Sequence, residues 1–94
     1  MAHTVYILAS RPHGAIYIGH TTNLSWRLKH HRAGLCGHTA RYAIHILVWF
    51  ENHDNFEASL LRERRIKRWR RAWKDQLITD ANPDWRDLTY RLSP

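Results

Sequence analysis

Residues 15–31 constrain the fold most, because a strand pattern passes there directly into a helix pattern. Ile16 and Ile18 flank Tyr17 in a β-branched and aromatic run that is typical of a strand. Gly19 then predicts an interruption, where the backbone turns or approaches a ligand closely. The sequence therefore predicts a strand that ends at this glycine and feeds a helix.

That helix is predicted to begin at Thr22 or Asn23, since either side chain can cap a first turn. Four residues then recur at helical spacing on one face, namely Leu24, Arg27, Leu28 and His31. The strand thus supplies a phenol, and the helix supplies a guanidinium and an imidazole one turn apart. Such groups are typical of a site that handles a phosphate.

Charge narrows the class of partner. The 94 residues include 15 Lys plus Arg and 8 Asp plus Glu, for a formal net charge of +7. This excess favours a polyanion, nucleic acid first and an anionic membrane second. Cys36 is a lone cysteine, which suits a reducing compartment, and neither a secretion signal nor a membrane-spanning run is evident. We therefore expect one globular domain, residues 1–94, in the cytoplasm and without a membrane partner.

The rest of the chain predicts two more strands and further helices. Residues 4–9 are predicted to pair antiparallel with the next strand through a short turn. After a loop at residues 33–39, residues 42–51 form a nearly continuous apolar run, which predicts a central strand covered on both faces. Asp54 and Glu57 have the spacing of a capping box at the start of a helix.

This helix is expected to break near Arg70 and to continue through Ile78, before a turn and a short terminal helix with Trp85 and Leu88 packed inward. The predicted order is β-β-α-β-α-α. It describes an α/β (α+β) fold, in which a small three-stranded antiparallel sheet is flanked by helices.

An ordered set of motifs in this chain resembles the GIY-YIG nuclease superfamily. Val5-Tyr6-Ile7 stands at the first motif, and Tyr17-Ile18-Gly19 is the second. Arg27 stands where the family keeps its arginine. Glu63 precedes Ile66-Lys67 as the family's metal-binding glutamate precedes an Ile-Lys pair. The chain looks like a small stand-alone member, similar to the N-terminal domain of excinuclease C.

Glu63 has two interpretations from its position alone. Between Leu60 and Ile66 it is a buried carboxylate that needs a cation, or it pairs with Lys67 on an exposed edge. The resemblance implies that it binds a metal ion, Mg²⁺ or alternatively Mn²⁺, since one carboxylate suits an ion that retains waters. Glu57 competes for this role but is better explained by the capping box.

Arg27 is either a surface arginine or a phosphate ligand, and the resemblance favours the phosphate ligand. Tyr6 and Tyr17 would ordinarily be packing residues with a hydrogen-bonded tip. The resemblance implies instead that a motif tyrosine activates the attacking water. We assign Tyr17 as the base and Tyr6 as its partner.

Two histidines belong to the same predicted site. His20 stands where several relatives carry lysine, so a positive charge there depends on pH. His31, one turn past Arg27, either contacts phosphate or relays a proton, or it belongs to a basic surface cluster. The eight histidines lack the spacing of a closed zinc site, so we expect no zinc.

A basic run is predicted to bind nucleic-acid phosphates, and its residues are Arg62, Arg64, Arg65, Lys67, Arg68, Arg70, Arg71 and Lys74. Trp69 and Trp73 within it either stack on unpaired bases or lie in the core, and their spacing of four favours the core. Asn82 is the nearest candidate for an asparagine that relatives carry after the glutamate helix.

We therefore predict a Mg²⁺-dependent endonuclease that hydrolyses DNA phosphodiesters, in repair or recombination. Its predicted catalytic residues are Tyr6, Tyr17, His20, Arg27, His31 and Glu63, with Glu63 as the metal ligand. The alternatives are a non-catalytic nucleic-acid-binding module and an adaptor for an acidic protein. The sequence leaves open the form of DNA, a targeting protein partner, and a monomer or weak homodimer.

Overall fold

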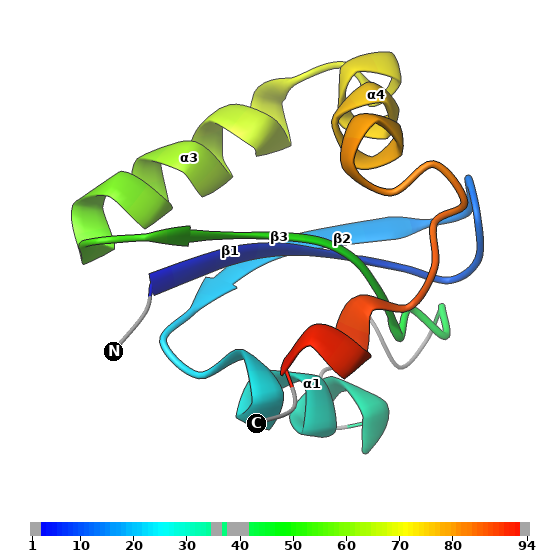
Figure 1. The fold of residues 1–94 in the computed structure, drawn as a ribbon, viewed down its shortest axis with the longest axis horizontal. Helices are drawn as coiled ribbons and strands as arrows, with labels where there is room; N and C mark the ends of the chain where they lie inside the picture. The colour runs from blue at the N-terminus through cyan, green and yellow to red at the C-terminus, as the bar shows by residue number, and fades with distance from the viewer. Residues whose placement is uncertain (1–2, 35–36, 38–41, 93–94) are drawn as a thin grey trace.

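Two layers of helices enclose a three-stranded antiparallel sheet in the computed structural model, which describes residues 3–34, 37 and 42–92 (Figure 1). The strands are β1 (His3–Ala9), β2 (Ile16–Thr21) and β3 (Ile46–His53). The helices are α1 (Leu24–Arg32), α3 (Phe56–Arg68), α4 (Arg71–Ala81) and the 3-10 helix η1 (Leu88–Leu92). This arrangement confirms the predicted fold class and element order.

The central strand is β1, because the order across the sheet is β2-β1-β3. The prediction that the third strand is central is therefore wrong, and that strand also begins at Ile46, four residues later than expected. Its first half is nevertheless buried by helices on both faces, which explains the continuous apolar run. The predicted loop at residues 33–39 falls largely outside the described residues, as does Cys36.

Alternate side chains of β1 fill two separate cores. Val5 and Ile7 point toward α3 and α4, where they pack in one cluster with Ile66. Tyr6 packs on the opposite face with Leu28 of α1. Figure 1 shows the same division, with α3 and α4 above the sheet and α1 and η1 below it. Successive residues of β1 therefore face opposite helical layers.

Asparagine side chains cap two of the helices. Asn23 accepts a hydrogen bond from the backbone N–H of Trp26 at 3.1 Å, which confirms one of the two predicted caps of α1. At α3, the cap is Asn55 rather than Asp54. The predicted capping box is wrong, because the helix begins one residue later and Glu57 then lies one position too early to complete the box.

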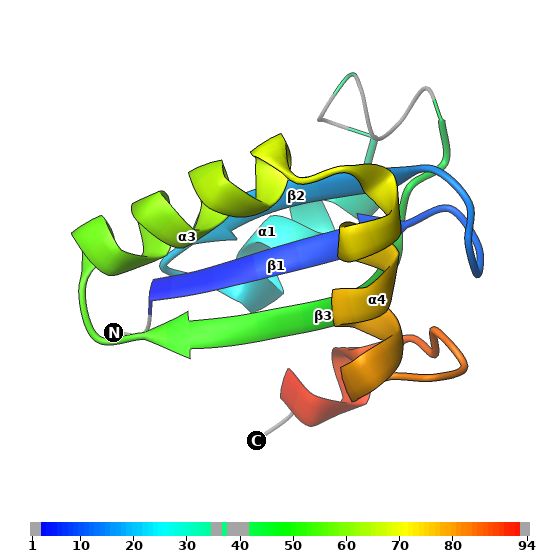
Figure 2. The same ribbon diagram turned by 90° about the horizontal axis from the view of Figure 1, so that it is seen from above.

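The break between the two long helices occurs where the sequence predicts it, at Trp69 and Arg70. From there α4 turns across the sheet, as Figure 2 shows from above. Asn82 follows α4 and is buried, and its amide N–H groups donate to the carbonyls of Val48 (3.0 Å) and Arg86 (2.9 Å). Asn82 thus fastens the C-terminal segment to β3, while Trp85 is buried as predicted.

No helix in the described part of the chain is long and apolar enough to cross a bilayer.

Candidate active site

Gly19 lies inside β2, directly opposite Tyr6 of β1, and the strand continues through it to Thr21. The predicted interruption of the strand is therefore wrong. A Cβ atom at Gly19 would lie 2.6 Å from the hydroxyl oxygen of Tyr6 and 2.8 Å from its Cζ. The missing side chain makes room for the phenol ring, which then reaches the helix beneath the sheet.

Tyr6, Tyr17 and His31 form an aromatic cluster between the sheet and α1. The hydroxyl of Tyr6 lies 3.0 Å from Nε2 of His31, and both side chains are buried, with about 1% of each residue exposed. The ring centroids of Tyr17 and His31 are 5.2 Å apart, and those of Tyr6 and Tyr17 are 6.3 Å apart. The structure therefore places His31 in the predicted site and excludes the surface-cluster interpretation.

His31 favours its neutral form. Burial lowers the pKa of His31 from its ordinary value, and the positive charge of Arg27 lowers it further, with smaller effects from His30 and His45. A neutral imidazole has one ring nitrogen free to accept a proton. When that nitrogen is Nε2, the Tyr6 phenol donates to it and is held in a fixed orientation.

Arg27 projects from α1 beside this cluster and is half-buried. Its Nε atom is buried without a hydrogen-bond partner among the described residues. Leaving a charged donor unpaired is costly, and a guanidinium satisfies its donors best with two oxygens of one oxyanion. The geometry at Arg27 thus suits a phosphate group.

Glu63 occupies the opposite face of the sheet, on α3. Its residue is 8% exposed, and its Oε2 lies 3.2 Å from Nδ1 of His20 and 3.5 Å from Nζ of Lys67. Both interpretations of Glu63 hold in part, because the carboxylate is buried and also paired with Lys67. Nδ1 of His20 is buried and makes no hydrogen bond to any described residue, so its contact with Glu63 is an ion pair when the imidazole is protonated.

The six predicted catalytic residues thus fall into two groups, one on each face of the sheet. Tyr6, Tyr17 and His31 meet on the α1 side with Arg27 beside them, whereas His20 and Glu63 meet on the α3 side. Strand β2 carries residues of both groups and is an edge strand, paired with β1 alone among the described strands. Both groups therefore have a member on this one edge strand, Tyr17 in the first and His20 in the second.

Glu63 supplies one donor of the type that a hard divalent cation takes, a carboxylate. Within residues 3–34, 37 and 42–92, no three His, Cys, Asp or Glu side chains come together as a metal-binding group. Glu63 offers one carboxylate, and the buried Nδ1 of His20 beside it has no hydrogen bond within the same residues. A single carboxylate is sufficient for Mg²⁺, which keeps several waters and takes further ligands from substrate phosphates.

The basic run is only partly available to a ligand. Arg62 pairs with Glu51 at 3.0 Å, Lys67 pairs with Glu63, and Arg71 pairs with Asp75 at 2.7 Å. The exposed members of the run without an ion pair in the described structure are Arg64, Arg65, Arg68 and Arg70, and Lys74 is half-buried. Part of the run therefore stabilises the fold itself.

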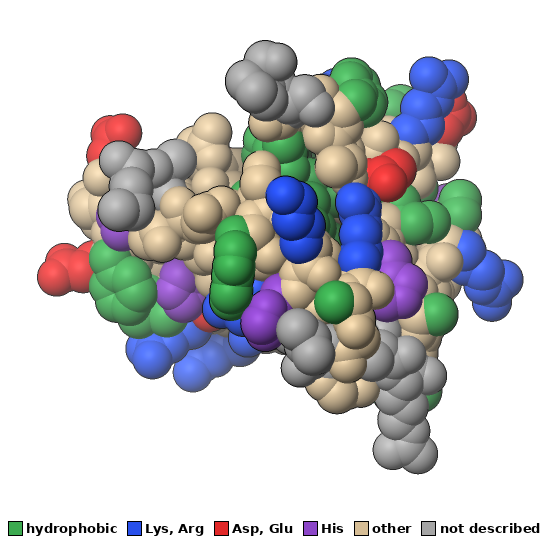
Figure 3. Space-filling view, turned by 90° about the horizontal axis from the view of Figure 1, so that it is seen from below, with side chains coloured by type: hydrophobic (Ala, Val, Ile, Leu, Met, Phe, Trp, Pro, Cys, Tyr) green, Lys and Arg blue, Asp and Glu red, His purple; other side chains and the backbone are tan. Residues whose placement is uncertain are grey.

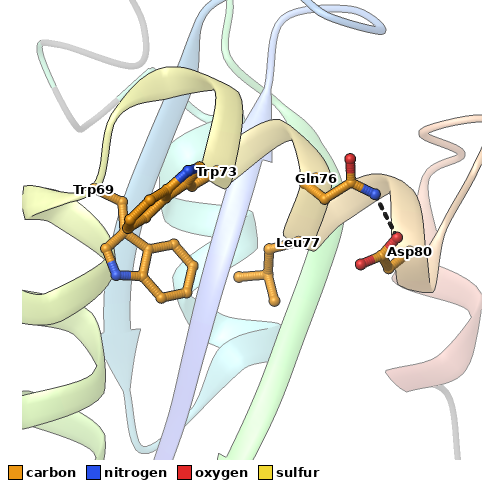
Figure 4. Close-up of a pocket in the computed structure, with 5 residues that line it drawn as sticks. All are labelled: Trp69, Trp73, Gln76, Leu77 and Asp80. Atoms are coloured by element: carbon orange, nitrogen blue, oxygen red, sulfur yellow. Dashed lines mark hydrogen bonds between the residues drawn. The ribbon is translucent and has the colours of Figure 1, made fainter.

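A shallow apolar groove of about 280 Å³ lies where α3 meets α4, and Trp69, Trp73, Gln76, Leu77 and Asp80 line it (Figure 4). Trp69 is half-buried, but Trp73 is 54% exposed, so the core prediction is wrong for Trp73. The reason is the helix break, because the spacing of four that predicts a shared face applies only within one helix. Trp69 ends α3 and Trp73 belongs to α4.

Sequence reasoning missed one residue near the site, Trp26. It is 53% exposed on α1 and stacks on His30, with ring centroids 4.4 Å apart. The available signal was a large aromatic residue directly before Arg27, at a helix position outside the spacing of Leu24, Leu28 and His31.

Comparison with known proteins identifies the family. The sequence model of the GIY-YIG catalytic domain matches residues 2–76. The chain belongs to the GIY-YIG family. This GIY-YIG domain is also 35% identical over 79 residues to a UPF0213 protein of Natronomonas pharaonis, a match that covers 83% of the chain and 92% of the relative. It is 37% identical over 84 residues to a UPF0213 protein of Haloquadratum walsbyi, covering 85% and 93% of the two chains.

A solved structure agrees with this assignment. The solution NMR structure of a UPF0213 protein from Bacillus halodurans aligns with the GIY-YIG domain at a TM-score of 0.57 and 26% identity, covering 95% of each chain. GIY-YIG domains are nuclease domains. Membership of the family therefore indicates an endonuclease-type function, with DNA as the implied substrate.

Proposed function

We propose that this GIY-YIG domain is a metal-dependent endonuclease that hydrolyses phosphodiester bonds in DNA. The observation that carries the proposal is the placement of two complementary groups along β2. One contains Arg27, whose buried Nε is unpartnered among the described residues, and the other contains the buried Glu63 carboxylate. A role in DNA repair or recombination within the cytoplasm belongs to the same proposal.

Arg27 binds two oxygens of the scissile phosphate and stabilises the charge that grows on them in the transition state. Its guanidinium is suited to this because it is permanently charged and its buried Nε lacks a partner in the described structure. Trp26 precedes it, and the arginine's carbon Cζ lies 5.8 Å from the centroid of that indole ring. The guanidinium is thus held at the surface of α1.

Tyr17 takes a proton from the attacking water, whose oxygen then bonds to phosphorus while a bridging P–O bond breaks. Tyr17 is half-buried, whereas Tyr6 is about 1% exposed and bonded to His31, so Tyr6 positions the site. An ordinary phenol has a pKa near 10 and is a weak base at neutral pH.

Glu63 would hold the metal ion, Mg²⁺ or alternatively Mn²⁺, through its carboxylate oxygens. Bound there, the ion supplies Lewis-acid polarisation of the phosphate and stabilises the charge on the leaving oxygen. Without an ion, Lys67 and His20 stabilise the negative charge of the buried Glu63 carboxylate, because each places a basic nitrogen within 3.5 Å of Oε2.

The test is cleavage of labelled single-stranded, duplex and branched DNA in Mg²⁺, Mn²⁺ or EDTA. Glu63→Gln should lower the cleavage rate by at least about 100-fold, the scale on which loss of transition-state charge stabilisation acts. The matched control is Glu57→Gln on the exposed first turn of the same helix, which should cut like the wild type. Salt-sensitive binding with no cleavage in any metal would instead support a non-catalytic binding module.

A further inference from the structure

Helix α1 presents an exposed tryptophan among basic side chains, of which Arg32 is paired with Asp87 at 3.2 Å. Its nine residues include two arginines, one lysine and two histidines, and they contain no Asp or Glu. Trp26 is 53% exposed, and its indole stacks on the imidazole of His30 with an angle of 27° between the planes. The ring is therefore held in one orientation while much of its surface faces solvent.

Figure 3 shows the side of the molecule that carries α1, with Lys, Arg and His side chains gathered in the middle of that face. A polyanion is the class of ligand that such a face attracts. An indole held among cations supplies what these cations lack, which is a flat apolar surface for a base.

Trp26 lies close enough to Arg27 for one nucleotide to contact both side chains. The guanidinium carbon of Arg27 lies 5.8 Å from the centre of the indole ring. A nucleotide likewise carries its base only a few ångströms from its phosphate. A phosphate on Arg27 therefore brings a neighbouring base within reach of Trp26.

We propose that Trp26 stacks on an unpaired nucleobase beside the phosphate that Arg27 binds, so that the domain favours single-stranded or locally unpaired DNA. In a duplex, both faces of a base are covered by neighbouring base pairs, and stacking on a side chain first requires unstacking. This inference rests on the proposed function of Arg27.

Trp73 is the natural comparison, because it is 54% exposed and has the guanidinium carbon of Arg70 at 5.2 Å from its ring centre. Its groove, however, is lined by the carboxylate of Asp80, which repels a phosphate backbone (Figure 4). The same helix also carries Asp75, which pairs with Arg71. Charge thus favours Trp26 over Trp73 as the site of the base.

The experiment measures binding by fluorescence anisotropy in EDTA, with three labelled probes of equal charge per phosphate. These are a short single strand, its duplex, and the same single strand with abasic nucleotides. Trp26→Ala should weaken binding of the single strand roughly 5- to 100-fold, the range expected for loss of one base–aromatic stack. Trp26→Phe, which keeps a ring, should retain most of the affinity.

The abasic strand and the duplex should bind Trp26→Ala and the wild type alike, because neither offers an unpaired base. Trp73→Ala, matched in residue type and exposure, should cost less affinity than Trp26→Ala. Unfolding midpoints of all variants should be similar, since both side chains are more than half exposed.

Unchanged binding of the single strand by Trp26→Ala would overturn the inference, as would an equal loss on the abasic strand or a larger loss in Trp73→Ala. If Trp26→Ala changed the oligomeric state seen by sedimentation but left DNA binding intact, the inference would be overturned, and Trp26 would instead contact a second copy of the protein. Arg27→Ala separates the two proposals. If Arg27→Ala weakens binding and Trp26→Ala does not, only the stack fails, whereas wild-type binding and cleavage by Arg27→Ala removes the proposed function itself.

Discussion

On the α3 side of β2, the Glu63 carboxylate is paired with two basic side chains, whereas on the α1 side Arg27 has a buried Nε with no hydrogen-bond partner among the described residues. Glu63 is the proposed ligand of the metal ion and Arg27 the proposed ligand of the phosphate, so the two sides of β2 would serve different steps of one reaction.

Removing the phenol oxygen of Tyr17 should have the largest effect on the cleavage rate. Tyr17→Phe should lower the single-turnover cleavage rate by roughly 10²- to 10⁴-fold, the usual contribution of a general base. Its unfolding midpoint should stay close to that of the wild type, because Tyr17 is only half-buried. Tyr6→Phe is the comparator. It leaves the buried His31 without its phenol partner and should lose about 1–3 kcal/mol of stability.

If Tyr6→Phe instead abolished cleavage at unchanged stability and Tyr17→Phe cut normally, Tyr6 would be the general base and Tyr17 the positioning residue.

Adding a methyl group at Gly19 should disrupt the α1 side through packing alone. The new Cβ would approach the Tyr6 hydroxyl oxygen to 2.6 Å, so the ring must move away from His31. Gly19→Ala should therefore lower the free energy of unfolding by about 1–3 kcal/mol, as overpacking of a core does. Chemical denaturation measures this, and Gly37→Ala is the control, since a Cβ there meets no atom of the described residues within 4 Å. Equal stability of the two variants would contradict the close approach.

Acidification should weaken the α1 side through His31. Because the pKa of His31 is lowered in the folded protein, the unfolded chain binds the proton more tightly. The contribution of His31 to the free energy of unfolding is then greatest above its ordinary pKa of about 6.5 and is lost as the pH falls toward the folded-state pKa. Denaturation between pH 5 and pH 7.5 should show a smaller pH dependence in His31→Gln than in the wild type.

A His31→Gln curve that parallels the wild type would contradict the shift.

Neutralising Lys67, on the α3 side, should give the smallest change in stability. Lys67 is 51% exposed at the side chain, so its pair with Glu63 is screened by solvent and should contribute at most about 1 kcal/mol. Lys67→Met should also reduce the Mg²⁺ concentration needed for half-maximal cleavage, because a competing cation leaves the carboxylate. Lys29→Met on α1 removes the same charge away from Glu63 and should leave the metal requirement unchanged. A higher Mg²⁺ requirement in Lys67→Met would count against Glu63 as the metal ligand.

The local parts of this site were predictable from the sequence, and the long-range parts were not. The Tyr17–Arg27 stretch determines its own strand and helix through alternation, a cap and helical spacing, so the sequence alone assigns its side chains to their elements. The position of Glu63 between Leu60 and Ile66 left two interpretations open, a buried carboxylate that needs a cation or an exposed pair with Lys67. The Glu63 partner His20 lies 43 positions earlier in the chain, and only the packing of α3 over β2 brings the two together.

Three of the errors share one cause, which is that a local pattern does not report the tertiary neighbour. Gly19 looked like a break in a strand, yet its role is to admit the ring of Tyr6 from the adjacent strand. The apolar run of β3 predicted a central strand, although helices on both faces bury an edge strand equally well. The exposure of Trp73 depends on the angle at the helix break, which the spacing of the tryptophans does not encode.

The most direct test of the division between the two sides of β2 compares Arg27→Ala with Glu63→Gln in two measurements, DNA binding in EDTA and single-turnover cleavage in Mg²⁺. Arg86→Ala, an exposed arginine remote from the predicted site residues in sequence, is the charge-matched control for binding. Both variants should lose at least about 100-fold in cleavage rate. Only Arg27→Ala should weaken binding in EDTA, because the proposed role of Glu63 is to hold the metal ion, which EDTA removes. Cleavage at the wild-type rate by either variant would contradict a single reaction served by both sides of the strand.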